Sequence, residues 1–534
     1  MEPSVTRVPT TKPDAAGGGT GRAAAFVATG ILVSRLVGLV RQRVISHYFG
    51  LSTDAADAWA AGFRIPNLLQ NLFGEGALSA SFVPVYAGLR SQQRSRDADA
   101  VAAVVGWWLV LLVSASVAIG VWLTPWAIGL IAPGFSGEKR ALTIAVVRVL
   151  FPGAGLLVMS AWCLGILNSH RRFFLSYASP VAWSVVMIAA MLWYGPSTEL
   201  PRLVVILAWA SVAGTLLQLM VQLPLVFRLA PGVRARRPVS VEAKQVMRNF
   251  LPTLLSRGVV QFSAYIDTVI ASWLPLGAVA ALTNAQTLYT LPVSLFGISI
   301  AAVELPAMSA QISDDNAAFD GLRLRLNASL RRIAFFVVPS AVAFVALGDV
   351  IAAALLQTGR FGPSDAVWVW KILAGSSIGL LASTLGRLYA STFFALRDTR
   401  SPLRFAVVRV VLTSLCGYLC AIPLPRALGL DPAWGTAGLT ASAGLAGWVE
   451  LLLLRRALNA RIGPTGVSVG YVSRLWVAAA VGAATGRAVT LVLPAVPPVV
   501  LAVAVLGPYG VVFLGLAVAF GVTESVPRQL HFWR

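Results

Sequence analysis

Charged side chains lie inside the first two long apolar segments of this sequence, where they could do chemistry. They are Arg35, Arg41, Asp57, Arg64 and Glu75. A charge in the middle of a membrane segment costs roughly 2.5–3.5 kcal/mol on insertion scales, so it persists when it faces a cavity, a partner charge or a substrate. We therefore expect these side chains to line a polar cavity, and Arg35 lies nearest the middle of its segment.

Snorkelling is the alternative explanation for cations near the end of a segment, because a long side chain can reach the membrane interface. Arg41 and Arg43 lie late in the first segment, and His47 lies later still. We favour snorkelling for Arg43 and His47, and we keep Arg35 and Arg41 as cavity residues.

Membrane helices must position these residues, and the composition predicts such helices. The chain has 534 residues, of which 57% are hydrophobic and 12% charged, and its mean hydropathy is +0.78. Soluble domains carry about 25% charged residues. In lipid each segment must satisfy its own backbone polar groups, so long apolar runs form helices. The sequence therefore predicts an all-α integral membrane protein.

Fourteen apolar segments are long enough to span a membrane. We place them at 24–48, 57–92, 101–133, 140–169, 173–195, 200–230, 244–274, 279–312, 328–358, 366–394, 402–424, 432–458, 468–493 and 496–523. Several exceed the roughly 20 residues of a straight span, so they must tilt, kink or project into water. An even number of spans puts both termini on one side.

The basic residues between segments predict the orientation, since cytoplasmic loops are enriched in Lys and Arg. The loops expected inside carry Arg90, Arg94, Arg96, Arg171, Arg172, Arg228, Arg234, Arg236, Arg237, Lys244, Arg323, Arg325, Arg331, Arg332, Arg397, Arg400, Arg404, Arg455, Arg456 and Arg461. The loops expected outside carry only Lys139, Arg140, Arg202, Arg360 and Arg426. We expect a disordered cytoplasmic tail at 1–23 and a cytoplasmic C-terminus at 524–534. The same distribution explains the net charge of +21 without a nucleic-acid partner.

A weak internal repeat relates the first six spans to the next six. Ser34-Arg35-Leu36-Val37 resembles Ser256-Arg257-Gly258-Val259, and Leu72-Phe73-Gly74 before Pro84 resembles Leu295-Phe296-Gly297 before Pro306. Chance similarity between apolar stretches is the alternative. Parallel repeats of this kind are related by an axis along the membrane normal, and transporters bind substrate at their interface. We therefore expect two six-helix lobes, 24–230 and 244–458, followed by two extra helices at 468–523.

Cysteine and histidine are too few to suggest a metal or redox centre. Cys163, Cys416 and Cys420 all lie in apolar stretches, where buried packing is expected and a disulfide framework is not. The histidines are His47, His170 and His531, and their spacing forms no zinc or haem motif.

The first two segments carry motifs that resemble the MurJ (MviN) lipid II flippase family. Ser34-Arg35-Leu36-Val37-Gly38-Leu39-Val40-Arg41 is similar to the first-helix signature of that family. The second-helix signature of that family resembles four pieces of this sequence, which are Asp57, Phe63-Arg64-Ile65-Pro66-Asn67-Leu68-Leu69, Leu72 to Ser79 and Phe82-Val83-Pro84. The resemblance extends from about residue 24 to 520 and includes the fourteen-span layout.

The resemblance implies a transporter of the multidrug/oligosaccharidyl-lipid/polysaccharide exporter superfamily, and not an enzyme. Such a protein moves lipid II, the undecaprenyl-pyrophosphate-linked disaccharide pentapeptide, between leaflets of the bacterial cytoplasmic membrane for peptidoglycan synthesis. It would act as a monomer among membrane lipids, by alternating access, with 468–523 forming a groove for the lipid tail. Guanidinium groups suit this task because they stay charged and pair with phosphate in forked geometry.

Pyrophosphate-binding residues follow from the same resemblance, although the sequence departs from the family at three positions. The implied ligands are Arg35, Arg41, Arg64, Asn67 and Arg257, with Asp57 and Glu75 as supporting cavity acids. The family usually has an acid after the first-helix arginine, where this sequence has Gln42. It usually has an arginine in the second helix where this sequence has Gln70. A further arginine of the eighth helix is replaced by Gln286 or Thr287. We expect Arg257 to substitute for the missing cations.

A sodium ion is the only cofactor that the sequence suggests. Some members of the family hold sodium in the second lobe with an acid near the position of Asp267, and Asp398 and Ser414 could add oxygen ligands. Carboxylate and hydroxyl oxygens suit a hard cation. Alternatively, Asp398 caps the loop before the eleventh span.

Three other functions are compatible with these residues. The lost cavity cations would fit an exporter of another polyprenyl-linked lipid or polysaccharide. A membrane enzyme acting on polyprenyl phosphates would need carboxylates or histidines at the interface. The candidates are Asp97, Asp99, Asp314 and Asp315, and no soluble domain accompanies them. A non-transporting scaffold is the fourth possibility.

Overall fold

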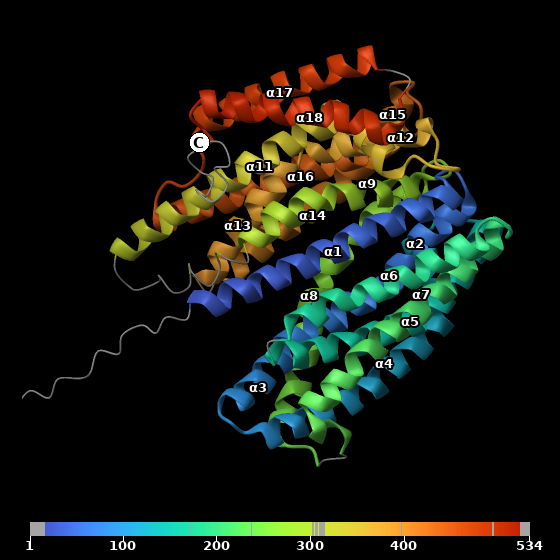
Figure 1. The fold of residues 1–534 in the computed structure, drawn as a ribbon, viewed down its shortest axis with the longest axis vertical. Coiled ribbons are helices and arrows are strands. Elements are labelled where there is room, and N and C mark those ends of the chain that lie inside the picture. The colour runs from blue at the N-terminus through green and yellow to red at the C-terminus, as the bar shows by residue number, and fades with distance from the viewer. Residues whose placement is uncertain are drawn as a thin grey trace, which may run out of the picture.

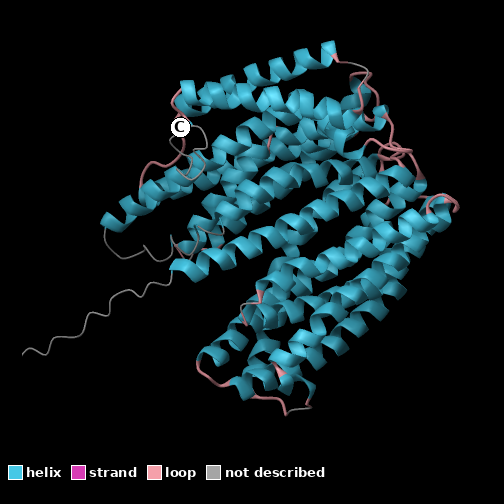
Figure 2. Ribbon diagram, in the orientation of Figure 1, coloured by secondary structure: helices cyan, strands magenta, loops and turns pink. Residues whose placement is uncertain are grey.

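The structure, a computed structural model of the chain, is built from long helices (Figures 1 and 2). It describes residues 17–170, 172–235, 238–301, 304, 308, 316–396, 398–493 and 496–523. Within these ranges, side chains are described except at 17–32, 65–66, 75–76, 80, 173, 176–177, 251–253, 255–264, 298 and 316–318. No strand occurs in the described ranges, which confirms the all-α class.

The first half of the chain forms seven helical stretches. They are α1 (Gly17–Phe49), α2 (Asp54–Leu69) continued by the π-helix η1 (Gln70–Leu78) and α3 (Ser79–Ser91), α4 (Ser95–Ile131), α5 (Gly137–Ser169), α6 (Phe173–Tyr194), α7 (Leu200–Leu229) and the short 3₁₀ helix η2 (Pro231–Arg234). The six expected spans of this half each coincide with one stretch, and the second span is α2, η1 and α3 together.

The second half repeats this order and adds two helices. Its elements are α8 (Val241–Ser272), α9 (Ala278–Pro292) with the π-helix η3 (Val293–Ile298), α11 (Asn316–Leu356), α12 (Pro363–Ser377), α13 (Leu380–Ala395), α14 (Arg400–Ala421), α15 (Pro423–Ala427), α16 (Trp434–Ile462), α17 (Val469–Val492) and α18 (Pro498–Ala519). Part of the expected segment 279–312 lies outside the described residues.

Eight described helices are long and apolar enough to cross a membrane, and the bent pair α12–α13 would make a ninth. Among the stretches outside this set are α1, α2 with α3, and α8. These three carry the charged candidates, since Arg41, Arg64 and Asp267 lie on them. The count does not cover these helices in full, because the described side chains leave out 17–32 of α1, 65–66, 75–76 and 80 of the second span, and most of 251–264 in α8.

The two Leu-Phe-Gly motifs of the repeat adopt the same local structure. Leu72-Phe73-Gly74 lies in η1, and Leu295-Phe296-Gly297 lies in η3, so both halves widen to a π-helix at the same place. A Cβ on Gly74 would meet the Ala161 Cβ of α5 at 2.9 Å, and a Cβ on Gly297 would meet Thr384 of α13 at 3.1 Å. In each half the glycine therefore lets the second span approach the fourth.

Helix pairing also matches between the halves. In the first half, α5 packs on α7, α6 on α7 and α1 on α6. In the second half, α13 packs on α16, α14 on α16 and α8 on α14, which are the pairs that the repeat predicts. Figure 1 shows α2 to α7 in one group and α9 to α18 in another, with α1 running between the two groups.

Each of the two large hydrophobic clusters contains residues from both halves of the chain. One contains residues of α3, α4, α5 and α7 together with Phe250 of α8, whose ring packs against Phe73 and Trp108. The other contains Phe49 and Trp59 of the first half with Ala280 of the second. The start of α8 is thus built into the core of the first half.

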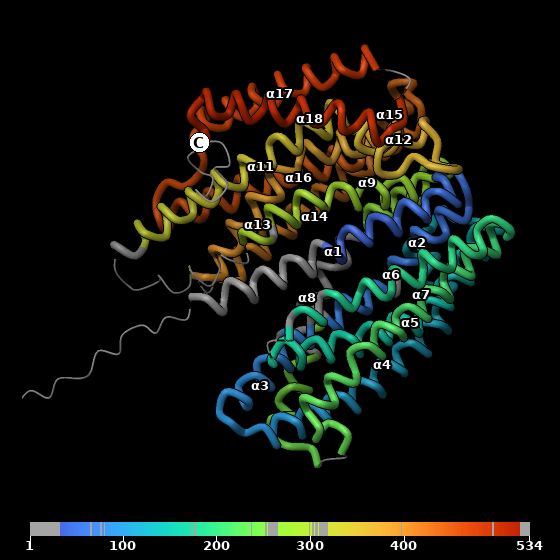
Figure 3. Tube along the Cα trace, in the orientation of Figure 1, coloured from blue at the N-terminus to red at the C-terminus, as the bar shows by residue number. Residues whose placement is uncertain are grey.

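The last two helices lie on the outside of the second half. Helices α17 and α18 pack on each other and on α11, at the far side from the first half (Figure 3). Their surface is largely apolar, with Val503 and Val511 more than two-thirds exposed.

Candidate functional site

Asp57 joins the two halves at one end of the bundle. It is only 1% exposed, and its carboxylate accepts hydrogen bonds from the backbone N–H groups of Gly277 at 2.9 Å and Ala280 at 3.0 Å. Lys139 forms an ion pair with the same carboxylate. The first turn of α9 has unsatisfied N–H groups and a positive dipole end, which a carboxylate stabilises. The carboxylate therefore serves as a cap between halves, with both oxygens engaged.

Loops from both halves meet around this cap. The N–H of Arg360 donates to the carbonyl of His47 at 2.8 Å, and the N–H of Gly134 donates to the Ser272 hydroxyl at 3.1 Å. Gly359 has a φ of +56°, and a Cβ there would lie 2.5 Å from the His47 carbonyl oxygen. These loops all belong to the side that the charge pattern assigns to the outside, so the halves are closed together at that end.

Arg41 lies on α1 among neutral groups. Its Nη1 donates to the Ser184 hydroxyl at 3.2 Å, and its guanidinium lies over the Trp183 ring, 4.4 Å from the centroid. Cation–π contact with tryptophan stabilises a guanidinium without neutralising it. Neither contact supplies a negative charge, so Arg41 keeps its capacity to bind an anion.

Gln42 and Ser46, also on α1, contact the second half through one residue. Gln42 Nε2 donates to Asn284 Oδ1 at 2.8 Å, and the Ser46 hydroxyl donates to the same oxygen at 3.2 Å. Gln42 occupies the position where the family usually has an acid, and it serves here as a neutral donor to α9.

Arg64 on α2 contacts the second half at Gln286 and Tyr265. Its Nη2 donates to Gln286 Oε1 at 2.8 Å, and its backbone carbonyl accepts from the Tyr265 hydroxyl at 2.7 Å. Thr287 instead turns its hydroxyl back to the carbonyl of Thr283 at 2.9 Å. Of the two positions considered for the missing arginine, Gln286 is therefore the one that meets Arg64, and its amide oxygen accepts where an arginine would repel.

Asp267 faces a small cavity inside the second half. The cavity has a volume of about 140 Å³, and its lining includes Asp267, Gln286, Tyr289 and Arg409. Asp267 interacts electrostatically with both Arg64 and Arg409, and its Oδ1 has no hydrogen-bond partner among the described residues. Arg409 also pairs with Glu450 of α16 at 3.1 Å. A network of opposite charges therefore runs from α2 through α8 and α14 to α16.

Asp398 and Ser414, the other two expected sodium ligands, are occupied elsewhere. Asp398 accepts from the Ser401 hydroxyl at 2.7 Å and from Arg461 at 2.6 Å, as well as from two backbone N–H groups. The Ser401 bonds, followed by Arg461, hold the pKa of Asp398 well below its ordinary value. Ser414 donates to the carbonyl of Val410. The described residues contain no group of three or more His, Cys, Asp or Glu side chains that could hold a metal ion.

The remaining predicted residues lie on the expected helices. Arg35 is exposed on α1, and Asn67 is partly buried on α2. Glu75 lies in η1 and Arg257 in α8, and both side chains fall outside those that the structure describes. Sequence reasoning missed Trp183, Asn284, Arg409 and Glu450. The last two are charges within apolar segments, so the rule that selected Arg35 would also have selected them.

Comparison with known proteins identifies the family. The model of the family described as "Lipid II flippase MurJ" matches residues 45–520, which leaves the Ser34–Arg41 signature just outside the match. The chain is 33% identical to the lipid II flippase MurJ of Burkholderia cenocepacia, over 80% of this chain and 82% of that one.

Solved structures agree on the fold. A structure titled "Lipid II flippase MurJ, inward closed conformation" superimposes with a TM-score of 0.75 at 20% identity, covering 93% of this chain and 98% of that one. An inward-facing multidrug transporter of the MATE family matches with a TM-score of 0.63 at 18% identity, covering 82% and 98% of the two chains. The chain belongs to the MurJ family of lipid II flippases, which are multi-pass membrane transporters and not enzymes.

Proposed function

We propose that this protein moves lipid II from the inner to the outer leaflet of the bacterial cytoplasmic membrane, with both termini in the cytoplasm. The observation that carries the proposal is the setting of Arg41. Its guanidinium is held by Ser184 and Trp183 and forms no ion pair with another described residue. A positive charge fixed in place but left without a carboxylate suits an incoming pyrophosphate.

The pyrophosphate site would lie between two lobes, 24–230 and 244–458. Arg64 would join Arg41 there, because it reaches across to Gln286 of α9. Arg35 and Asn67 lie on the same two helices, and Arg257 would approach from α8. The helices α17 and α18 would carry the polyprenyl tail on their exposed apolar surface.

Alternating access would act on the end capped by Asp57. Contacts from three loops, at Gly134, Gly277 and Arg360, close this end, and the positive-inside pattern assigns it to the outside. This arrangement corresponds to a state that receives substrate from the cytoplasmic side. Release would require separation of Asp57 from α9.

Complementation tests the proposal most directly. The chain should restore growth to bacteria depleted of their own flippase, and Arg41→Ala should abolish rescue at equal membrane abundance. Arg202→Ala is the matched control, because Arg202 is an exposed arginine at the start of α7, away from the site. Labelling of lipid II by a probe added outside the cells should be high in the strains whose growth is restored and low in those whose growth is not.

Failure of the wild-type chain would contradict the proposal. Transport of a different polyprenyl-pyrophosphate-linked saccharide in vesicles, with no transport of lipid II, would instead support the exporter alternative. The loss of cationic residues at Gln70 and Gln286 is the feature that favours that alternative.

A further inference from the structure

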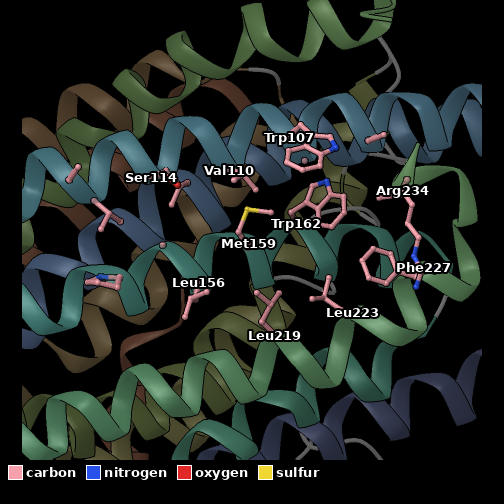
Figure 4. A pocket seen from close by; sticks show the side chains of 18 residues that line it. Trp107, Val110, Ser114, Leu156, Met159, Trp162, Leu219, Leu223, Phe227 and Arg234 are labelled. Carbon is pink, nitrogen blue, oxygen red and sulfur yellow. The ribbon is translucent and has the colours of Figure 1, made fainter. Parts of the chain in front are cut away.

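A deep apolar cavity opens on the first half, away from the arginine site. Its volume is about 800 Å³, which lies within the roughly 300–1,000 Å³ typical of ligand pockets. Helices α4, α5 and α7 line it, and η2 closes one end. Figure 4 shows Trp107, Trp162, Phe227 and Arg234 gathered at that end, and Ser114 and Leu156 further along.

Small residues create the space. Gly106, Ser114 and Ala118 of α4 face the cavity, as do Pro152 and Gly155 of α5. The walls include Val110, Met159, Leu219 and Leu223. Both Ser114 and Trp107 are exposed, so the cavity opens on the apolar outer surface of the bundle, where its occupant must come from the membrane.

A cation lies at the η2 end. The Arg234 guanidinium lies 4.3 Å from the centroid of the Phe227 ring, and among the described residues it forms no ion pair. Asp99, the nearby acid, accepts the N–H of Gly232 at 3.0 Å. Trp162 is 4% exposed, and its indole Nε1 has no acceptor within the described part of the chain. The Trp162 nitrogen is itself fully buried, so what this end of the cavity offers a ligand is the positive charge of Arg234.

The repeat provides an internal comparison. A second cavity, of about 360 Å³, is lined by α11, α13 and α16, the counterparts of α4, α5 and α7. There α17 covers the opening with Val469, Val472 and Trp476. The arginine at that end, Arg455, donates to the carbonyl of Thr465 at 2.8 Å. In the second half, the chain itself supplies both an apolar cover and an acceptor for the arginine.

We propose that the first-half cavity binds an anionic glycerophospholipid, with acyl chains between α4 and α7 and the phosphate against Arg234. The acyl chains of the lipid provide the apolar cover that α17 provides in the other half. Its phosphate provides the acceptor for the arginine, as the Thr465 carbonyl does there. By the orientation of the loops, it belongs to the cytoplasmic leaflet. Both anionic and zwitterionic lipids have a phosphate that can pair with Arg234. The guanidinium favours the anionic lipid, because in phosphatidylcholine the choline cation offsets the phosphate charge and is repelled by Arg234. This lipid is distinct from the transported substrate.

Native mass spectrometry of the purified full chain tests the site, with palmitoyl-oleoyl phosphatidylglycerol and phosphatidylcholine as probes. Ser114→Trp should fill the cavity from an exposed position and reduce retention of phosphatidylglycerol about tenfold, as loss of roughly 1.4 kcal/mol would. Ala115→Trp is the matched control, because Ala115 is the exposed neighbour that does not line the cavity.

Headgroup selection has its own pair of variants. Arg234→Gln should remove the preference for phosphatidylglycerol, since a hydrogen bond to a charged group contributes enough for about a tenfold change. Arg228→Gln, at an exposed arginine of α7 that does not line the cavity, should leave the preference intact. Unchanged retention in Ser114→Trp would overturn the proposal, as would equal binding of the two lipids by the wild type. Recovery of a polyprenyl lipid or a membrane peptide, displaced by Ser114→Trp, would also overturn it.

Discussion

The carboxylate of Asp57 on α2 accepts the backbone N–H of Gly277, 220 positions later, at 2.9 Å. Helix α9 begins at the next residue, so a side chain of the first half caps a helix of the second. The cap is therefore one of the contacts that close this end of the bundle, together with those of Arg360 with His47 and of Gly134 with Ser272.

Asp57→Asn should weaken this closure. Asparagine keeps one acceptor but loses the negative charge opposite the helix terminus and Lys139, an effect of up to about 2 kcal/mol in partly buried geometry. Spin labels on cysteines at the exposed positions Ser136 and Ser364 should report an additional population at longer distance. Asp54→Asn, which removes an exposed acid from the same first turn of α2, should leave the distances unchanged. Equal behaviour of the two variants would show that Asp57 does not hold the end closed.

Gly359→Ala should destabilise the protein more than Gly429→Ala. Both glycines have φ near +60°, where an L-residue costs roughly 1–2 kcal/mol. Only at Gly359 would the added Cβ also meet the other half, at the carbonyl of His47, whereas Gly429 has nothing within 4 Å. Thermal unfolding in detergent measures the difference, and equal losses would mean that the loop contact contributes nothing.

Gln286→Leu should reduce both stability and transport. The change removes an acceptor of the Arg64 guanidinium, and hydrogen bonds to charged groups contribute about 1.5–3 kcal/mol. Thr287→Val is the control, because the Thr287 hydroxyl bonds only to its own helix at Thr283. If the threonine variant loses as much as the glutamine variant, the contact between Arg64 and Gln286 has no special role.

The stability of the protein should fall as the pH is lowered, because His170 binds a proton more readily in the unfolded chain than in the folded one. Burial, followed by the charges of Arg90 and Arg172, lowers the pKa of His170 from its ordinary 6.5 to about 4. A depressed pKa in the folded state means that the unfolded chain binds the proton first, so this contribution is complete above pH 6.5 and is lost between pH 6.5 and 4. The unfolding midpoint of His170→Gln should therefore decline less than that of the wild type over this range. Parallel declines would contradict the assignment, and the contact between Tyr86 and His170 at 3.0 Å would then be the only role of the ring.

Transport should not require sodium. Arg409 lines the same cavity as Asp267, and Arg64 bonds to Gln286 on its wall, so a further cation there would be repelled. Replacing sodium by potassium on both sides of reconstituted vesicles should leave the flipping rate unchanged. A several-fold loss of rate, restored by adding sodium, would establish the ion site that the sequence first suggested at Asp267.

Local patterns in the sequence determined the helices and the family. Apolar runs require helices in lipid, wherever the helices pack, and the motifs at Ser34–Arg41 and Arg64–Pro84 are continuous in the chain. The Leu-Phe-Gly repeat likewise predicted equivalent positions, and the structure places a π-helix at both. Such features depend on neighbours in sequence, so one chain is enough to recognise them.

Partnerships between distant helices were decided only by the tertiary structure. Asp57 was expected to line a cavity, yet both of its oxygens are engaged by α9 and Lys139. The choice between Gln286 and Thr287 depends on the rotation of α9, and a turn of about 100° between neighbours separates a residue that meets Arg64 from one that does not. Asp398 and Ser414 have oxygens that suit a cation, but local partners engage them. The residue type determines what a side chain can bind, whereas helix packing determines which groups it contacts.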